Sequence, residues 1–364
     1  MKIPFVDLKS QYENIKGEID EAIATVISET SFIGGKHVDN FENNFKILYG
    51  SPYCLPVGNG TDSLYIIMKM LGIGAGDEVI TTAYSWISSS ETISQCGAKP
   101  VFVDIDEYYT IDVKKIREVI TPRTKAIMPV HIHGQMCDMN EIMKIANEYN
   151  LAVIEDCAQS HFSEYEGVRA GLRGEASSFS FYPGKNLGAY GDAGAILCKS
   201  EELYTKFKMF ARHGALIKHQ HKIEGINSRM DGIQAAILNA KLPYILEWTE
   251  ARIKNAAIYS EALKDVEWLE LPKVRENTKH SFHLYVIKTE FRNELMAHLK
   301  EHNIETAIHY PVALPNMDAY KSLGSASPFE ICTKNQDMVL SLPMYPELSK
   351  DQILYVVDVI KKFK

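Results

Sequence analysis

The sequence has few cysteines, no long apolar run and no excess of positive charge. Its net charge of −8 argues against a surface that binds nucleic acid. The six cysteines show neither metal-ligand spacing nor the density of a disulfide framework, so we expect reduced thiols and no metal. No stretch has the pattern of a signal peptide or the length of a membrane span, which predicts a cytoplasmic protein without membrane contact.

What the sequence does contain is an alternation of strand-like and helix-like stretches from about residue 50 to about residue 200. With 364 residues and 46% hydrophobic content, the chain can bury a sizeable core. The alternation is typical of an α/β fold with three layers and a mostly parallel sheet. We expect a large domain over residues 1–250, including the N-terminal segment, and a smaller C-terminal α+β domain over 251–364. Expected strands are 79–82, 100–104, 126–130, 152–155 and 280–287, and expected helices are 230–240 and 245–264.

The most informative segment is 178–195, which holds Lys185 between an apolar run and a glycine-rich turn. Pro183 and Gly184 end the run where an ammonium group would otherwise enter the core. A lysine near apolar walls loses its proton readily, and the free amine can form a Schiff base with a carbonyl. The alternative is an ordinary surface lysine on a loop.

A second site lies at the end of the apolar run that precedes Asp156. The pattern predicts a buried parallel strand, and ligand crevices form outside the carboxyl ends of such strands. Asp156 and Gln159 should therefore face a site, whereas Glu155 alternates to the other face and is expected to be structural. A carboxylate paired with a Schiff-base lysine fits pyridoxal phosphate, because the acid keeps the pyridine nitrogen protonated.

A phosphate site is the third requirement, and the start of the amphipathic segment 60–71 offers one. Gly60 and Thr61 begin a helix whose free N–H groups suit an anion, although a plain helix cap is the alternative. Trp86 follows a strand and could stack on a cofactor ring, but it could equally belong to the core.

Several other patterns resemble sites but are not expected to be sites. Residues 72–77 resemble a dinucleotide-binding loop, yet they precede a strand instead of following one. His213, His219 and His221 lie in a polar loop without nearby acids, which argues against a metal. His131 and His133 are expected to line the pocket or to be satisfied core histidines.

Taken together, these segments resemble the nucleotide-sugar aminotransferases of the DegT/DnrJ/StrS type, which are pyridoxal-phosphate enzymes of fold type I. The resemblance spans nearly the whole chain. The residues around Lys185 are similar to the subgroup that aminates the sugar at C3″. One departure is His133, where many members have tyrosine. The segments that carry the resemblance are 3–8, 32–35, 57–62, 76–80, 100–104, 130–135, 155–159, 178–195, 227–236, 309–311 and 340–343.

The resemblance implies a role for each matching residue. Lys185 would bind the cofactor covalently and move the proton, and Asp156 would pair with the pyridinium nitrogen. The remaining contacts to pyridoxal 5′-phosphate would come from Gln159 to the ring oxygen, Trp86 to the ring face, and Gly60, Thr61, Ser180 and Asn227 to the phosphate. Candidate contacts to the nucleotide-sugar are Arg229, His309 and Tyr310. Asn227 and Arg229 would act across the interface of a homodimer.

The implied reaction moves an amino group from L-glutamate to a nucleotide-linked keto-sugar. The leading substrate is a dTDP-linked 3-keto-6-deoxyhexose, for a surface polysaccharide such as the O-antigen of lipopolysaccharide, or for another glycoconjugate. A UDP-linked 3-keto-sugar and a C4″ keto-sugar remain alternatives. A regulatory protein that keeps the fold without turnover is a further alternative, although Lys185 and Asp156 are both retained.

Overall fold

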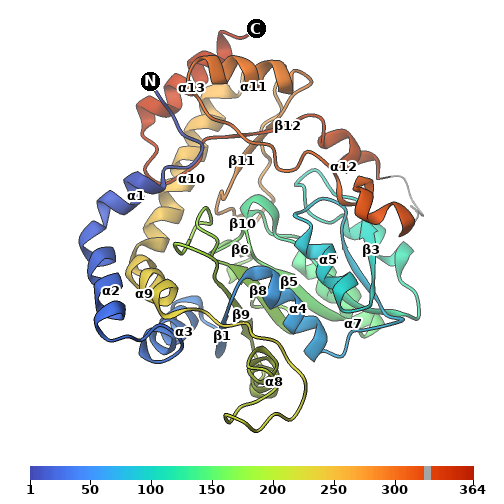
Figure 1. The fold of residues 1–364 in the computed structure, drawn as a ribbon. Coiled ribbons are helices and arrows are strands. Elements are labelled where there is room, and N and C mark those ends of the chain that lie inside the picture. The colour runs from blue at the N-terminus through green and yellow to red at the C-terminus, as the bar shows by residue number, and fades with distance from the viewer. Residues whose placement is uncertain (324–328) are drawn as a thin grey trace.

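The computed structural model describes residues 1–323 and 329–364, and a seven-stranded sheet forms the centre of its larger part (Figure 1). Its strand order is β1-β9-β8-β5-β4-β2-β3. Only β9 runs opposite to its neighbours, and the other pairs are parallel. The strands are β1 (Tyr53–Val57), β2 (Glu78–Thr82), β3 (Lys99–Val103), β4 (Thr124–Met128), β5 (Ala152–Asp156), β8 (Ala176–Ser180) and β9 (Gly194–Cys198).

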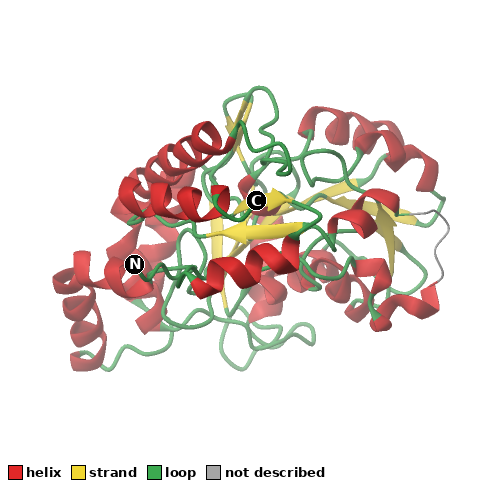
Figure 2. Cartoon of the chain, turned by 90° about the horizontal axis from the view of Figure 1, so that it is seen from above, coloured by secondary structure: helices red, strands yellow, loops and turns green. Residues whose placement is uncertain are grey.

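Helices cover both faces of this sheet, as Figure 2 shows from above. Along β9, Ile196 packs with α4 and α8, whereas Leu197 packs on the opposite side with α3, α7 and α9. The strands are buried on both faces, which explains why the sequence shows apolar runs there instead of alternation. The predicted three-layer α/β class is confirmed. The helices of these layers are α3 (Lys36–Tyr49), α4 (Gly60–Met70), α5 (Ser88–Gln95), α6 (Val113–Ile116), α7 (Met139–Tyr149), α8 (Glu201–Ala211) and α9 (Gly232–Lys241).

The C-terminal part is built on an antiparallel pair of strands with helices packed against it. Helix α10 (Ile245–Leu263) joins the two parts, because Ile245 lies in the core of the large sheet and Tyr259 in the C-terminal core. Ile3 also lies in the C-terminal core. The division at residue 250 stays a prediction. The remaining elements are α1 (Leu8–Asn14), α2 (Lys16–Ser28), β11 (Tyr285–Lys288), α11 (Arg292–Glu301), α12 (Glu330–Asn335), β12 (Val339–Leu342) and α13 (Lys350–Lys361).

The strand expected over 280–287 is shorter than the sequence pattern predicts. Only β11 is a strand there, and the residues before it run across the carboxyl edge of the large sheet. The amide of Ser281 donates to the carbonyl of Gly134 at 3.1 Å, and the amide of Leu284 donates to that of His133 at 3.2 Å. These bonds to a loop replace the strand ladder. Just before this crossing, β10 (Thr278–Lys279) joins β6 (Glu164–Tyr165) and β7 (Val168–Arg169) in a small sheet.

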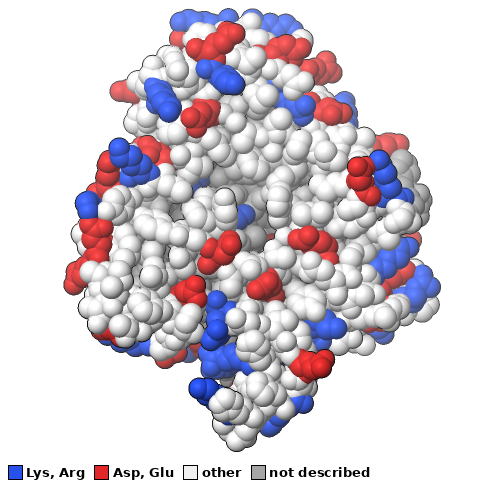
Figure 3. Space-filling model, in the orientation of Figure 1, with Lys and Arg blue, Asp and Glu red and all other residues white. Residues whose placement is uncertain are grey.

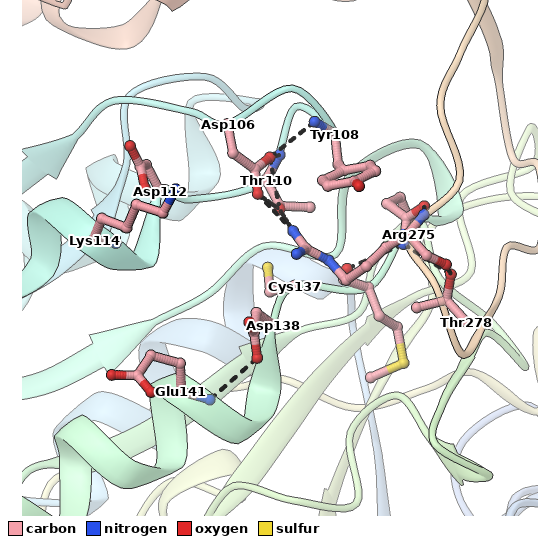
Figure 4. Close-up of polar contacts among 12 residues, drawn as sticks. Asp106, Tyr108, Thr110, Asp112, Lys114, Cys137, Asp138, Glu141, Arg275 and Thr278 are labelled. Atoms are coloured by element: carbon pink, nitrogen blue, oxygen red, sulfur yellow. Dashed lines mark hydrogen bonds and ion pairs between the residues drawn. The ribbon is translucent and has the colours of Figure 1, made fainter.

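Arg275, which precedes β10, ties this part of the chain to the loop that follows β3 (Figure 4). Its Nη2 donates to Asp106 Oδ2 at 2.5 Å and to Thr110 Oγ1 at 3.1 Å. Its guanidinium group also lies over the ring of Tyr108, 4.3 Å from the centroid. Segments far apart in the sequence are therefore fixed against each other beside the carboxyl edge of the sheet.

All six cysteines are buried and have free thiols, as expected. Within residues 1–323 and 329–364, no helix combines the length and the apolar character that crossing a membrane requires.

Candidate active site

Lys185 lies in a tight turn that follows β8. The amide of Lys185 donates to the carbonyl of Tyr182 at 2.8 Å, and the amide of Ala189 donates to that of Phe181 at 2.8 Å. A Cβ atom on Gly188 would lie 2.2 Å from the carbonyl oxygen of Pro183, so only glycine fits there. Gly188 thus allows the chain to fold back sharply behind Lys185.

The ammonium group of Lys185 is poorly solvated. Burial lowers its pKa to about 8, and only the nearby charge of Asp156 opposes that shift. Within the described residues, Lys185 Nζ forms no hydrogen bond and no ion pair. Burial, followed by the charge of Lys185, lowers the pKa of His161 to about 3 and that of His309 to about 4. Both imidazoles are therefore neutral near pH 7, and burial outweighs the charge of Asp156, which favours a free amine at Lys185.

Asp156 ends β5 and is held by two donors. The hydroxyl of Ser89 donates to Oδ2 at 2.9 Å, and the amide of Ala158 donates to Oδ1 at 3.1 Å. Burial raises the pKa of Asp156, while these two bonds and then the charge of Lys185 lower it. The structure thus brings Asp156 and Lys185 together at the carboxyl edge of the sheet, as the sequence predicts.

Glu155 points to the other side of β5 and is part of the scaffold. Its carboxylate accepts hydrogen bonds from the amides of Gly171, Arg173 and Gly174 at 2.7–2.8 Å. His131 Nε2 lies 3.0 Å from Glu155 Oε2, and His131 Nδ1 accepts the amide of Cys137 at 3.2 Å. A satisfied core histidine was one of the two predictions for His131.

Two histidine-containing groups offer potential metal ligands. His131, Glu155 and Cys157 have ligand atoms within 4.8 Å of one another. An ion there would have to displace the hydrogen bonds that occupy both His131 nitrogens and both Glu155 oxygens. His213, His219 and His221 lie on an exposed loop, where His221 Nδ1 bonds the carbonyl of His213 at 2.7 Å. Neither arrangement favours a metal.

The start of α4 lies against the end of β8. Asn59 Oδ1 caps the helix by accepting the amide of Asp62 at 2.7 Å, while the amides of Gly60 and Thr61 have no partner among the described residues. A Cβ atom on Gly60 would approach the Cβ of Ser180 to 2.8 Å. The three residues predicted to hold a phosphate within the subunit, Gly60, Thr61 and Ser180, are thus brought together.

Gln159 lies between the large sheet and the C-terminal part of the chain. Its Oε1 accepts the amide of His133 at 2.7 Å, and its Nε2 donates to the hydroxyl of Tyr310 at 2.7 Å. The ring of Trp86 lies 6.0 Å from that of Tyr310 and is 60% exposed, so Trp86 is not a core residue. Beside it, His309 Nδ1 bonds Ser341 Oγ at 2.9 Å.

Asn227 and Arg229 are exposed and lie in the loop between α8 and α9. Arg229 Nε donates to Asn227 Oδ1 at 2.8 Å. Within the described chain, neither side chain bonds another predicted site residue. Ser228 between them accepts the amide of Gly58 at 3.0 Å, which holds the segment beside the approach to α4.

Sequence reasoning missed several residues of this region. Ser89 belongs to a run of serines at the start of α5, directly after the loop that follows β2. That place could have indicated that its side chain faces the carboxyl edge of the sheet. No pattern marked His161, Tyr84 or His283, which lie close to Lys185 or to Tyr310 only because of tertiary packing. Asn186, next to Lys185, bonds His283 Nδ1 at 3.1 Å.

These observations together fit pyridoxal phosphate. The half-buried Lys185, whose amine has no partner among the described residues, lies near enough to the buried Asp156 for that charge to affect its pKa, and a helix start with free amides follows β1. Figure 3 shows a hollow in the middle of the face turned to the viewer, with basic atoms visible inside it and acidic atoms at its rim. The fold and this arrangement define a pyridoxal-phosphate enzyme of the aminotransferase class.

The chain belongs to the DegT/DnrJ/EryC1/StrS aminotransferase family, whose model matches residues 13–361. A dTDP-3-amino-3,6-dideoxy-alpha-D-galactopyranose transaminase of Aneurinibacillus thermoaerophilus is 42% identical over 99% of both chains. A "Pleiotropic regulatory protein" of Geobacillus stearothermophilus is 41% identical over 100% of this chain and 99% of its own. A UDP-2-acetamido-2-deoxy-3-oxo-D-glucuronate aminotransferase of Pseudomonas aeruginosa is 40% identical over 96% of this chain and 97% of its own.

Solved structures agree with this assignment. DesV of S. venezuelae superimposes with a TM-score of 0.97 and 36% identity, covering 99% of this chain and 98% of DesV. NtdA of Bacillus subtilis, solved with bound cofactor PMP, has a TM-score of 0.91 and 31% identity, covering 99% of this chain and 85% of that one. The predictions of fold type, of an aminotransferase and of pyridoxal phosphate as the cofactor are confirmed.

Proposed function

We propose that the protein transfers an amino group from L-glutamate to the C3″ keto group of a dTDP-linked 3-keto-6-deoxyhexose. The observation that carries the transfer is the half-buried amine of Lys185, whose lowered pKa leaves part of it uncharged near neutral pH, near the carboxylate of Asp156. The sugar is supported by the name of the Aneurinibacillus thermoaerophilus relative, a dTDP-3-amino sugar transaminase. The product would serve a surface polysaccharide, such as an O-antigen, or another glycoconjugate.

Each residue then has a defined task. Pyridoxal phosphate supplies the electron sink that makes the α-carbon of the amino donor acidic. Lys185 would hold the cofactor and, when displaced, its Nζ would move the proton from that carbon to the cofactor. Asp156 keeps a negative charge against the pyridine nitrogen.

The remaining predicted contacts hold the cofactor and the sugar nucleotide. Gly60, Thr61 and Ser180 bind the phosphate, Gln159 donates to the ring oxygen and Trp86 covers the ring. His309 and Tyr310, which approach from the C-terminal part of the chain, contact the sugar nucleotide.

We further propose a cytoplasmic homodimer in which Asn227 and Arg229 complete the site of the partner subunit. Both side chains are exposed, are bonded to each other and form no hydrogen bond with another predicted site residue in the described part of the chain. An exposed arginine would supply positive charge to a sugar nucleotide, which an acidic chain must bind locally. Exposed Ile217 and Ile223 in the loop before Asn227 support burial of this region against a second copy.

Two other substrates and one other class remain as alternatives. The Pseudomonas aeruginosa relative acts on a UDP-linked 3-oxo sugar acid, which favours a UDP-linked 3-keto-sugar as the second candidate. A C4″ keto-sugar is distinguished only by its product. A regulatory role accords with the name of the Geobacillus stearothermophilus relative, but it gives no reason for a half-buried lysine of lowered pKa near a buried aspartate.

An absorbance experiment tests this proposal. The purified protein with pyridoxal phosphate should absorb near ~410 nm, and L-glutamate should replace that band by one near ~330 nm. Among dTDP- and UDP-linked 3-keto and 4-keto sugars, the one that restores the first band identifies the acceptor. Lys185→Met is the matched control and should show neither change. No band in the wild-type protein would contradict the enzyme assignment, and a band unchanged by every sugar would contradict the substrate class.

A further inference from the structure

Tyr84 bonds both backbone polar groups of one residue, Tyr310. Tyr84 is fully buried in the loop after β2. Its hydroxyl donates to the carbonyl oxygen of Tyr310 at 2.9 Å and accepts the amide of Tyr310. A hydroxyl offers one donor and can accept, so both capacities are used on the same residue. The backbone of Tyr310, which comes from the C-terminal part of the chain, is thereby fixed against the large sheet.

The side chain of Tyr310 continues this connection to Gln159. The amide of His133 can only donate, so the atom of Gln159 that it contacts must be Oε1. The Nε2 group of Gln159 must then donate to the hydroxyl of Tyr310, which acts as acceptor at 2.7 Å. One hydrogen of Nε2 and the hydroxyl hydrogen of Tyr310 remain, and neither has an acceptor among the described residues.

Both free donors therefore have directions fixed by the same chain of hydrogen bonds. We propose that Tyr84 is a positioning residue, which holds Tyr310 so that Gln159 and Tyr310 present one donor each to the bound cofactor and sugar. This inference rests on the proposed function, because it needs a ligand acceptor at that place. Tyr84 itself touches neither ligand, and its effect passes through Tyr310.

The test is a double-mutant cycle on cofactor binding. Pyridoxal phosphate is titrated into cofactor-free wild-type, Tyr84→Phe, Tyr310→Phe and doubly substituted protein, and the dissociation constant is read from absorbance. We expect each single substitution to weaken binding at least fivefold, and the double to be no more than twofold weaker than the worse single. The proposal would be overturned if the two fold-changes in dissociation constant multiply in the doubly substituted protein. An unchanged dissociation constant in Tyr84→Phe would also overturn it.

A second readout separates positioning from simple loss of stability. Tyr84→Phe leaves two backbone groups of Tyr310 without partners whether or not the Tyr310 hydroxyl is present, so its lowering of the thermal midpoint should persist in the Tyr310→Phe background. The cofactor effect should not persist there. If both effects persist equally, Tyr84 is only structural. Tyr285→Phe, which removes the buried hydroxyl that bonds Ser260 at 2.9 Å in the C-terminal core, is the matched control and should leave cofactor binding unchanged.

The same experiment distinguishes failure of this inference from failure of the proposed function. If wild-type protein does not bind pyridoxal phosphate, the proposed function fails before any variant is compared. If Tyr84→Phe is insoluble, Tyr84→His takes its place, because each imidazole nitrogen either donates or accepts and so cannot bond both backbone groups of Tyr310 as the hydroxyl does. Additivity with Tyr310→Phe then decides the question in the same way.

Discussion

The fully buried Nζ of Lys241 donates a hydrogen bond to the carbonyl oxygen of Gly188 at 2.8 Å, within the turn that carries Lys185. The same ammonium lies over the ring of Tyr190, 4.2 Å from its centroid. Gln234, also in α9, accepts the amide of Tyr190 at 2.9 Å. Helix α9 therefore fixes the far side of the turn, and with it the direction from which Lys185 enters the site.

Lys241→Met should loosen this turn without removing any predicted cofactor contact. Methionine fills similar space but leaves the carbonyl of Gly188 unpaired, and a hydrogen bond from a charged donor contributes about 1.5–3 kcal/mol. We expect pyridoxal phosphate to bind at least about fivefold more weakly, measured by absorbance titration. Lys199→Met is the matched control, since exposed Lys199 also bonds a backbone carbonyl, that of Arg173 at 3.2 Å. Equal affinity in the two variants would contradict a role for Lys241.

Asp156→Asn should preserve the geometry of the site and remove its charge. An asparagine oxygen can still accept the amide of Ala158, and its NH₂ group can donate to the hydroxyl of Ser89. The pyridine nitrogen would lose its anionic partner, so we expect kcat to fall by at least about 100-fold. Single-turnover kinetics with L-glutamate, followed by absorbance, measures the step directly. A rate within a few-fold of wild type would mean that Asp156 does not face the ring nitrogen.

The strands that carry this chemistry were predictable because each is a short apolar run ended by polar or glycine-rich residues. Asp156 and Lys185 stand at the ends of two such runs, and parallel neighbours place those ends together. The strand expected at 280–287 was wrong for most of its length, because Ser281 and Leu284 bond a loop of the large sheet instead of a partner strand. Such a choice depends on tertiary contacts that no periodicity records.

The residues that support the site were not predictable from the sequence for the same reason. Tyr84 and Tyr310 are far apart in the chain, and nothing near either one indicates that a hydroxyl will bond a backbone. Lys241 follows helical spacing in α9, and a lysine at a helix end is ordinarily taken as solvent-exposed. Lys241 is buried because the turn of Lys185 packs against it, and the sequence does not show that contact.

Glu155→Gln should destabilise the fold while leaving the atoms of the reaction untouched. Burial opposes ionisation of Glu155, but hydrogen bonds from His131 and from the amides of Gly171 and Gly174 hold its pKa below the usual value. A glutamine NH₂ group would face these donors. We expect a loss of about 3–5 kcal/mol, seen as a lower urea midpoint at pH 7.

The pH dependence of this effect has a defined sign. A carboxyl group whose folded pKa is lowered contributes stability above its unfolded pKa and loses it as the pH falls. The difference between wild type and Glu155→Gln should therefore shrink below about pH 4.5. Glu148→Gln, on the surface, should change the midpoint little at any pH. A Glu155→Gln midpoint equal to wild type at pH 7 would refute the scaffold role.

Lys185→Met, like Lys185→Ala, should abolish turnover and leave the fold intact. Without cofactor, Lys185→Met should be more stable than wild type. Burial lowers the folded pKa of Lys185 from 10.5 to about 8, so the unfolded chain binds more protons between these values. Stability of the wild type must then rise with pH across that window, and below it the full cost of the buried ammonium remains. The variant lacks that cost, on the order of 3 kcal/mol.

The thermal midpoint of Lys185→Met should therefore exceed that of wild type most at pH 7, and the difference should disappear toward pH 10. Scanning calorimetry of cofactor-free protein at pH 7, 8, 9 and 10 measures it, with the exposed residue variant Lys9→Met as a control that should show no such trend. Lys241, whose pKa is also lowered by burial, titrates in the same window, but it is present in every protein compared and cancels from the difference. A difference that stays constant from pH 7 to pH 10 would mean that the amine of Lys185 is solvated, and the argument for its free-base chemistry would fail with it.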